Sequence, residues 1–312
     1  MTTMKNQEVK CQPRRLDLAA CWGAGLLTAL ALAACGGGSV GKDALSGVCA
    51  PDSRTGLTWN SEAAETVNFA GLGALQAKAN ADSLCGHTNW RVPTANELLG
   101  LTSPAGAATP VTGTDTLPLS GRYWSGETVV GATDNAWAVD ASAGGVTAFV
   151  AKTLPNKVKL VRSEALPLAC GDVSRYQTRG DGTVIDTQTA LMWKQCSEGL
   201  SGSACDQGSL QTFTSLQNLM SRVTDANVAK ELGYTDWRLP SRNEMASLVN
   251  RACVTPALEA GFFPATAAAS YASNTPDANA ADRFWYVDFF QGDVGVGALT
   301  VGRPLRLVRA GR

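Results

Sequence analysis

Histidine is almost absent from this 312-residue sequence, in which His87 is the single example. One imidazole cannot supply both a catalytic triad and a metal site, and His87 stands between Gly86 and Thr88 in a predicted loop. C-x-x-C pairs are missing as well, so the nine cysteines do not indicate a zinc site. The composition therefore predicts no metal, no cofactor and no catalytic residue, and it disfavours an enzyme.

The N-terminal segment has the pattern of a secretory signal. Four basic residues within the first 15 positions precede a run of 17 residues, Leu18 to Ala34, that contains no charge. The run ends in the small-residue quartet Leu32-Ala33-Ala34-Cys35, which resembles the bacterial lipobox. This resemblance implies that residues 1–34 are removed and that the thiol of Cys35 receives a diacylglyceryl group. An ordinary signal peptide or an uncleaved membrane anchor is the alternative.

The segment after the predicted cleavage site supports the lipoprotein interpretation. Residues 35–48 begin with Cys35 and the run Gly36-Gly37-Gly38-Ser39, and glycine-rich stretches form flexible tethers. Gly36 rather than Asp follows Cys35, which resembles the default sorting to the outer membrane in two-membrane bacteria. We therefore expect a cell-envelope protein whose membrane partner is reached through the lipid on Cys35.

Length and charge limit the possible architectures and partners of the mature chain. Without residues 1–34 the chain keeps 22 basic and 25 acidic residues, a formal net charge of −3, and contains no run of like charges. Binding to nucleic acid is therefore not expected. Its length is sufficient for two domains of ordinary size.

Six cysteines follow Cys35, an even number in a chain predicted to be exported, which indicates disulfides. We predict that Cys49 pairs with Cys85 and that Cys196 pairs with Cys205, because eight intervening residues form an easily closed loop. The four cysteines of the second half allow three pairings, so a bond between Cys170 and Cys253 follows only by elimination.

Two segments of the chain repeat one unit. Residues Asn89–Leu98 match Asp236–Met245, and the later blocks recur in the same order at offsets of 147 or 148. Only the opening block differs, because Trp59 and Trp193 are 134 residues apart. The second copy thus carries 13 extra residues, which include Cys196 and Cys205. We predict domains at 49–163 (first copy) and 170–312 (second copy).

Local patterns predict an α+β unit with early helices and late antiparallel strands. Thr94-x-x-Glu97 and Ser241-x-x-Glu244 are capping boxes, each expected to begin a helix. Strands are expected around the turn Gln291–Asp293 and at Leu305–Arg309. An amphipathic helix that closes near Gly233 is predicted by apolar residues at Leu210, Phe213, Leu216, Leu219 and Val223.

The ordered blocks resemble the Lcl C-terminal domain family. In the second copy they are Gly180–Asp186, Ala190–Trp193, Gly233–Pro240, Phe284–Phe289 and Arg306–Arg309. The likeness covers about residues 172–311 strongly and 50–163 more weakly. This family is grouped with C-type-lectin-like folds, so the resemblance implies two tandem C-type-lectin-like units.

The sequence also departs from the family pattern. The first copy lacks the Asp-Gly-Thr-Val strand before Trp59, and Ala272 stands where the family often has Trp. The collagen-like stalk of the adhesin that gives the family its name is absent. That adhesin's binding to sulfated glycans therefore does not follow from the fold, and function must be argued from a site.

One modest basic cluster is a candidate contact for an anionic glycan. It consists of Lys152, Lys157, Lys159 and Arg162, at the end of the first copy. The alternative is that the lysines point outward and protect a strand from edge pairing.

Three further motifs have structural explanations that we favour. Asp140 and Asp288 occupy equivalent positions and suggest either a repeated ligand site or, preferably, caps of strand ends. The arginines of the two W-R-x-P blocks and the terminal Arg162 and Arg309 are expected to form ion pairs or to stack on tryptophans. Residues 179–181 spell Arg-Gly-Asp, which integrins recognise, although Asp-Gly also suits a hairpin turn.

Together these observations predict a lipid-anchored, non-catalytic binding or adhesion protein of the cell envelope that recognises a glycan or an envelope polymer. A structural envelope protein is the first alternative. An enzyme of the C-type-lectin-like superfamily is the second. The sequence does not indicate an oligomeric state.

Overall fold

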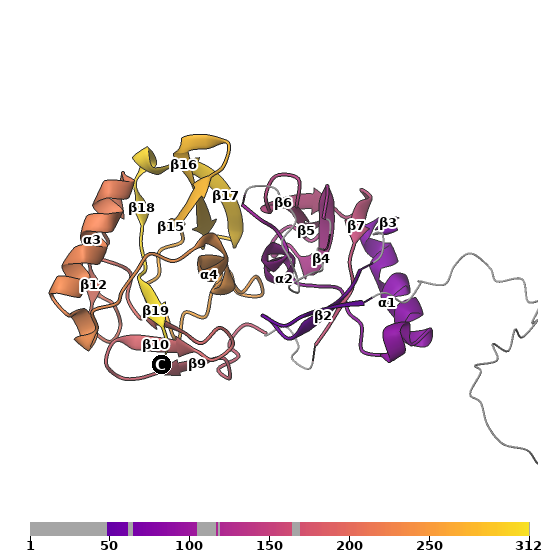
Figure 1. Ribbon diagram of the computed structural model, residues 1–312, viewed down its shortest axis with the longest axis horizontal. Helices are drawn as coiled ribbons and strands as arrows, with labels where there is room; N and C mark the ends of the chain where they lie inside the picture. Colours follow the sequence, from indigo (N-terminus) through magenta and orange to yellow (C-terminus); the bar gives the residue numbers. More distant parts are fainter. Residues whose placement is uncertain (1–48, 62–64, 105–116, 118, 164–168, 312) are drawn as a thin grey trace, which may run out of the picture. The chain divides into compact units, whose positions relative to one another are not determined.

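The computed structural model describes residues 49–61, 65–104, 117, 119–163 and 169–311, and Figure 1 labels their main helices and strands. All of these residues belong to one unit of the chain. The predicted signal 1–34, the lipid acceptor Cys35 and the tether 35–48 lie outside the described residues. Among the helices of the described part, none is both long enough and apolar enough to cross a bilayer.

Each copy is a mixture of short helices and mostly antiparallel strands, as the sequence predicts. The first copy contains β1 (Cys49–Asp52), β2 (Leu57–Asn60), β3 (Glu65–Val67), η1 (Phe69–Gly71), α1 (Leu72–Ala81), η2 (Leu84–Gly86), α2 (Ala95–Gly100), β4 (Arg122–Thr128), β5 (Asn135–Asp140), β6 (Val146–Ala151), β7 (Asn156–Val158) and β8 (Val161–Arg162).

The second copy repeats the order of the main strands and helices, but it adds β9, a small hairpin of β12 and β13, and η4, and it has no separate counterpart of η1 among the described residues. It contains β9 (Tyr176–Thr178), β10 (Thr183–Asp186), β11 (Leu191–Lys194), β12 (Leu200–Ser201), β13 (Gln207–Gly208), β14 (Thr212–Phe213), α3 (Leu216–Val228), η3 (Glu231–Gly233), α4 (Arg242–Ser247), β15 (Ser270–Asp277), β16 (Ala280–Asp288), β17 (Asp293–Ala298), η4 (Leu299–Val301), β18 (Arg303–Pro304) and β19 (Val308–Ala310).

The opening hairpin of each copy pairs with its closing strand. Trp59 in β2 pairs with Val161 in β8, and Trp193 in β11 pairs with Val308 in β19. Strands therefore precede as well as follow the helices, which qualifies the predicted order of early helices and late strands. Pairing the two ends buries both tryptophans completely.

The prediction that the first copy lacks a strand before Trp59 is wrong. β1 pairs with β2 from Cys49 opposite Asn60 to Asp52 opposite Leu57, and β10 pairs with β11 over four equivalent positions. The residues Cys-Ala-Pro-Asp form the strand that Thr-Val-Ile-Asp forms in the second copy. Backbone pairing with β2 and the Cys49–Cys85 disulfide hold this strand in place, although its sequence differs from the Asp-Gly-Thr-Val pattern of the family.

The amphipathic segment of the second copy is helical only from Leu216 onward. Ser215 caps α3, its hydroxyl accepting a hydrogen bond from the Asn218 amide at 3.2 Å. The predicted members Leu210 and Phe213 precede this cap, and Phe213 belongs to β14, which pairs with β18. Leu210 and Phe213 have the spacing of a helix, but the N-cap at Ser215 makes α3 begin after them.

Both predicted capping boxes are present. The Thr94 hydroxyl accepts from the Glu97 amide at 3.2 Å, and Ser241 accepts from Glu244 at 3.3 Å. Each glutamate also pairs with the arginine of its W-R-x-P block, at 2.6 Å from Arg91 and 2.6 Å from Arg238. The start of each short helix is thus tied to the W-R-x-P block before it.

The three disulfides follow the predicted pairing. Sulfur–sulfur bonds join Cys49 to Cys85, Cys170 to Cys253, and Cys196 to Cys205. The bond assigned by elimination is therefore confirmed together with the other two.

The copies are not independent, because they share one hydrophobic core. Each copy has a cluster of its own, built around Trp90 and Trp124 in the first copy and around Trp237 in the second. A third cluster contains buried side chains of both copies, among them Trp137 and Trp285. The two copies therefore pack against each other around this shared cluster.

Equivalent elements of the two copies face each other at their contact. Helix α2 packs on α4, and β6 packs on β17. The Thr147 hydroxyl accepts a hydrogen bond from the Val294 amide at 2.8 Å, and these residues are 147 positions apart, the repeat offset. Such self-pairing of equivalent surfaces is the geometry of a twofold dimer, here within a single chain.

The contact is not fully symmetric, because its two buried arginines, Arg242 and Arg251, come from the second copy. Arg251 donates to Asn96 Oδ1 at 2.7 Å and stacks over the Trp137 ring at 4.7 Å. The Nη2 atom of Arg251 donates to the Gly292 carbonyl at 2.7 Å. Arg251 therefore fastens the first copy to the turn before β17.

Asp293 lies beside this arginine and makes stability depend on pH. The pKa of Asp293 is raised to about 6, chiefly by burial and also by the charge of Asp288, although the charge of Arg251 acts in the opposite direction. A carboxyl in an unfolded chain titrates near pH 3.9, so between about pH 4 and pH 6 the folded protein holds the proton more tightly. The stabilisation is complete below that window and is lost as the pH rises through it.

Asp293→Asn is therefore expected to raise the free energy of unfolding at pH 7 by about 1 kcal/mol, a value reduced for solvent screening of a partly exposed group. It should also flatten the pH dependence between about pH 4 and pH 7. Urea unfolding at about pH 4 and about pH 7 measures both changes in the free energy of unfolding. The exposed Asp282→Asn is the matched control. An Asp293→Asn protein that keeps the pH dependence of the parent would exclude this origin.

Candidate functional site

A pocket of about 740 Å³ opens in the second copy. Its walls come from the turn between β9 and β10, from the end of β11 with the inserted segment after it, from the middle of α3, and from η3. The lining consists of Thr178, residues 180–182, residues 194–203, Arg222, Glu231 and Leu232. A pocket of this size is in the range that holds small-molecule ligands.

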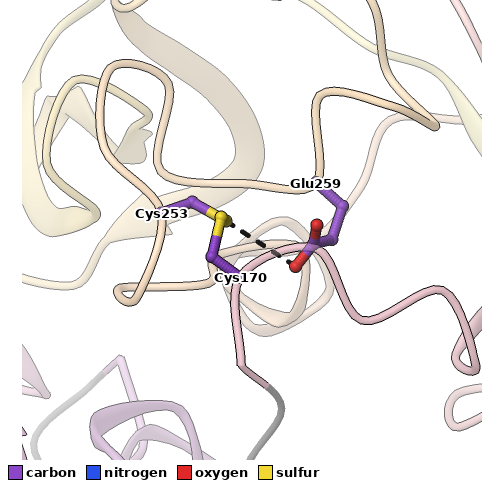
Figure 2. Close-up of side chains that lie close together, drawn as sticks. All are labelled: Cys170, Cys253 and Glu259. Atoms are coloured by element: carbon purple, nitrogen blue, oxygen red, sulfur yellow. Dashed lines mark hydrogen bonds between the residues drawn. A yellow bond between two sulfur atoms is a disulfide. The ribbon is translucent and has the colours of Figure 1, made fainter.

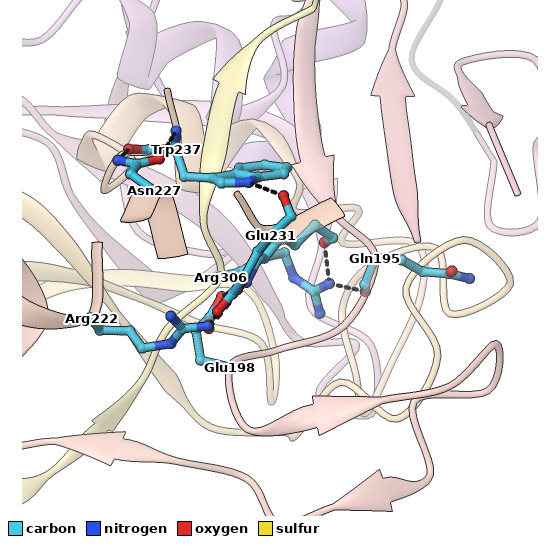
Figure 3. Close-up of polar contacts among 8 residues, drawn as sticks. Gln195, Glu198, Arg222, Asn227, Glu231, Trp237 and Arg306 are labelled. Carbon is cyan, nitrogen blue, oxygen red and sulfur yellow. Dashed lines mark hydrogen bonds and ion pairs between the residues drawn. The ribbon is translucent and has the colours of Figure 1, made fainter. Parts of the chain in front are cut away.

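Four charged side chains of this pocket form a closed ring of ion pairs. Arg222 Nη2 lies 2.5 Å from Glu198 Oε2 and 2.6 Å from Glu231 Oε2, as Figure 3 shows. Lys194 Nζ lies 3.0 Å from Glu198 Oε1, although without hydrogen-bond geometry at that oxygen, and it also pairs with Glu231. Two positive and two negative charges thus compensate each other.

The ring stabilises the ionised forms of two of its members, Arg222 and Glu231. Burial alone would lower the pKa of Arg222, but its hydrogen bond to Glu231 and the charges of Glu198 and Glu231 raise it overall. Burial likewise opposes the charge of Glu231, yet hydrogen bonds from Arg222 and Lys194 bring its pKa below the usual value. The pKa values of both groups therefore lie further from neutral pH than usual.

The 13-residue insert of the second copy builds one wall of the pocket. The Cys196–Cys205 disulfide closes its first part, and β12 within that loop pairs with β13, which directly follows the loop. Gly199 has a φ of +88°, and a Cβ on it would lie 2.2 Å from the Ser209 carbonyl oxygen. Only glycine fits at this crossing of the loop.

Arg306 holds the start of the insert from the protein interior. Its guanidinium donates to the carbonyls of Lys194, at 2.9 Å, and of Gln195 (Figure 3). It also donates to the hydroxyls of Ser197 at 3.1 Å and Thr266 at 2.6 Å. These bonds position the segment that carries Glu198.

In the first copy the insert is absent, and the positions equivalent to Arg222 and Glu231 carry apolar side chains. The indole of Trp90 donates to the Leu84 carbonyl at 2.9 Å, as that of Trp237 donates to the Glu231 carbonyl at 2.9 Å. Leu84 is thus the counterpart of Glu231. At the same offset Leu75 is the counterpart of Arg222, and both leucines contribute to the first copy's own core. The charged pocket is a property of the second copy.

One cluster of metal-ligand residue types occurs among the described residues, and a disulfide occupies it. Cys170, Cys253 and Glu259 lie close together (Figure 2). Because the two sulfurs are bonded to each other, they offer no thiolate to a metal ion. The Glu259 carboxylate instead accepts hydrogen bonds from the Gly171 amide at 3.0 Å and from Asn250 at 2.7 Å.

The predicted basic cluster does not form as one exposed surface. Lys159 is 2% exposed, because it occupies the position that Arg306 occupies in the second copy, and both face the interior. The prediction that Lys159 belongs to an exposed ligand-binding cluster is therefore wrong. Lys152 lies over the Phe69 ring, and Lys157 donates to the Ser120 carbonyl at 2.7 Å.

Arg162, the fourth predicted member, donates to the Asn89 side chain at 2.9 Å. Its counterpart Arg309 makes the same contact with Asp236 at 2.6 Å. Arg162 therefore repeats a contact that joins the closing strand of each copy to its W-R-x-P block. Binding of an anionic glycan by Lys152 and Lys157 stays a prediction.

The remaining motifs adopt turn geometry. Asp140 accepts hydrogen bonds from the Ser142 and Ala143 amides, and Asp288 accepts one from the Phe290 amide at 2.6 Å. In the Arg-Gly-Asp segment the residues flanking Gly180 pair with each other at 3.5 Å, and Gly180 has a φ of +75°. The structural explanations of both motifs are thus confirmed.

Sequence reasoning missed the pocket, although two signals for it were present. The insert marks a loop that the first copy lacks, and two leucines of the first copy become Arg222 and Glu231 in the second. A charged pair at positions that are apolar in the other copy indicates a changed environment. Only the fold shows that these two changes meet.

The Lcl C-terminal domain family model matches the chain at residues 49–162 and 182–309, which together make up more than half of its length. Among curated proteins none matches the chain. The first matched range coincides with the first copy, and the second covers the second copy from Gly182, after β9, to Arg309.

Proposed function

The chain belongs to the Lcl C-terminal domain family, and we propose that it is a lipid-anchored, non-catalytic binding protein of the cell envelope. Its ligand site in this proposal is the pocket of the second copy. The observation that carries the proposal is the insert, which together with Arg222 and Glu231 gives the second copy a charged pocket where the first copy is apolar. A C-type-lectin-like fold for both copies is part of the proposal.

The chemistry of the pocket favours binding over turnover. General acids and bases work best with pKa values near the working pH. The pKa of Arg222 is raised and that of Glu231 is lowered, so both keep their charge at neutral pH. The lining cysteine, Cys196, is bonded to Cys205 and is not a nucleophile in this state.

Export and lipid attachment are supported by the residues at the N-terminus and by the disulfides. Three disulfides in one chain are typical of an oxidising compartment outside the cytoplasm. Attachment to the outer membrane through the lipid on Cys35 would present both copies at a membrane surface. A purely structural role in the envelope is the alternative, and it requires no occupant of the pocket.

Cys35→Ser is expected to abolish lipid attachment, because the Leu-Ala-Ala triplet before Cys35 ends a long uncharged run, whereas the same triplet before Cys21 directly follows Asp17 and has no apolar run before it. Labelling of growing cells with radioactive palmitate measures this, and the protein band should lose its label completely. A Cys21→Ser protein is the matched control and should keep the label. Undiminished labelling of the Cys35→Ser protein would contradict the proposed anchor.

Binding itself is tested with the lipid-free chain, residues 36–312, and isolated cell envelopes. The variant Arg222→Leu/Glu231→Leu places the first copy's leucines in the pocket, and we expect it to bind envelopes about tenfold or more weakly. The exposed helix pair Lys78→Ala/Asp82→Ala is the control, with two opposite charges removed outside the pocket. Equal binding by the parent and the pocket variant would remove the pocket from the proposal.

A further inference from the structure

The charge balance of the pocket indicates the class of its ligand. Resting on the proposed function of this pocket, we infer that it binds an uncharged carbohydrate, such as the end of a neutral glycan. The relevant observation is that each positive charge around the pocket already faces a negative one.

An ionic ligand would have to break this ring. An anion that takes Arg222 would withdraw it from two carboxylates at 2.5 and 2.6 Å. The Glu198 side chain is 1% exposed, so it would be left buried with a single cation. Leaving a buried charge without its partners is strongly destabilising. A cationic ligand that takes Glu198 or Glu231 meets the same obstacle.

The charge balance continues at the rim. Asp181 lines the pocket and lies 3.5 Å from Arg179, so this carboxylate also has a counterion. No uncompensated cation therefore stands at the entrance among the described lining residues. A sulfated or phosphorylated ligand would find no free positive charge here.

An uncharged, hydroxyl-rich ligand can use the pocket without breaking the ring. Sugar hydroxyls both donate and accept, so they add hydrogen bonds to carboxylates and to ammonium or guanidinium groups. The hydroxyls of Ser201 and Ser203 are exposed on the lining. Leu200 and the 40% exposed Leu232 offer apolar surface for the C–H face of a sugar ring.

The volume sets the size of the part that is recognised. Pockets of about 300–1,000 Å³ hold ligands of ordinary small-molecule size, and this pocket has about 740 Å³. It is too small for a long polymer, and it is open on one side. One or two sugar residues at the end of a chain match this space.

Calorimetric titration of the lipid-free chain tests the inference. The probes are four neutral disaccharides (N,N′-diacetylchitobiose, cellobiose, maltose and lactose) and two anionic ones, a heparin disaccharide and digalacturonic acid. We expect a neutral sugar to bind, with a Kd that changes less than about twofold between about 50 and 500 mM salt. Arg222→Leu/Glu231→Leu should weaken this binding about tenfold or more, and Lys78→Ala/Asp82→Ala should leave it unchanged.

Two results would overturn the inference. The first is tighter binding of an anionic disaccharide whose affinity falls as salt rises and depends on Arg222. The second is no binding of any neutral disaccharide up to about 10 mM, a concentration that detects even weak sites. If the chain still binds envelopes through the pocket, the proposed function stands and only the ligand class is wrong. Circular dichroism of each variant confirms that it is folded.

Discussion

Replacing Arg242 with alanine is expected to lower the free energy of unfolding by about 3 to 5 kcal/mol. Arg242 is fully buried, and its guanidinium reaches from the second copy into the first. It donates to the Thr102 carbonyl at 3.0 Å and hydroxyl at 3.1 Å, and to the Gly144 carbonyl. The substitution leaves these acceptors buried without a donor and creates a cavity beside Trp285.

The environment of Arg242 shows how closely the copies fit. Burial lowers its pKa to about 10, and it stacks over the Trp285 ring at 4.6 Å. A Cβ on Gly145, where φ is +101°, would lie 2.9 Å from the Arg242 guanidinium and 2.3 Å from the Thr102 hydroxyl. Both the arginine and the glycine are therefore required at this contact.

Reversible urea unfolding with intact disulfides measures the effect of Arg242→Ala. Arg283→Ala is the matched control, since Arg283 is an exposed arginine of the same copy with one bond, to the Val296 carbonyl. We expect the control to change stability by less than about 0.5 kcal/mol. A loss below about 1 kcal/mol for Arg242→Ala would mean that this arginine does not fasten the copies.

Glu198→Ala is expected to destabilise the second copy by about 3 kcal/mol, because it breaks a buried ion ring by removing one member. Lys194 and Arg222 would then share the single carboxylate of Glu231. Both cations are largely shielded from water, with side chains 10% and 18% exposed. The excess positive charge cannot be fully solvated in this position.

The compensated double variant should behave differently. Arg222→Leu/Glu231→Leu removes one charge of each sign and introduces the residues of the first copy, so stability should stay within about 1.5 kcal/mol of the parent. Lys194 and Glu198, which lie 3.0 Å apart in the parent, are both kept in this variant and are expected to stay paired. Thermal unfolding of the double variant and of Glu198→Ala at one pH compares their stabilities with that of the parent. A double variant less stable than Glu198→Ala would contradict the ring as described.

Local features of the fold could be predicted from the sequence. Each capping box needs only a hydroxyl residue and a glutamate three positions later, and both helices begin where Thr94 and Ser241 predicted. The Cys196–Cys205 bond spans a short loop, which limits its alternatives. Such features depend on neighbours in the chain, which the sequence displays directly.

Features that depend on distant contacts could not be predicted in the same way. Lys159 and Lys157 have the same side chain two positions apart, yet only the fold places Lys159 in the interior. The partners of Arg242 are 98 and 140 residues away in the sequence. The ion ring likewise joins a strand, an inserted loop, a helix and a turn, so its members gave no shared local signal.

The most direct test of a binding site in the second copy is mapping by NMR. The isotope-labelled lipid-free chain is titrated with glycan fragments released from the cell envelope, and the backbone amide shifts are followed. We expect the largest changes in amide shift on residues 178–203, on Arg222 and on residues 231–232, with little change in the first copy. Changes concentrated at residues 152–162 of the first copy, or spread evenly over both copies, would contradict this expectation.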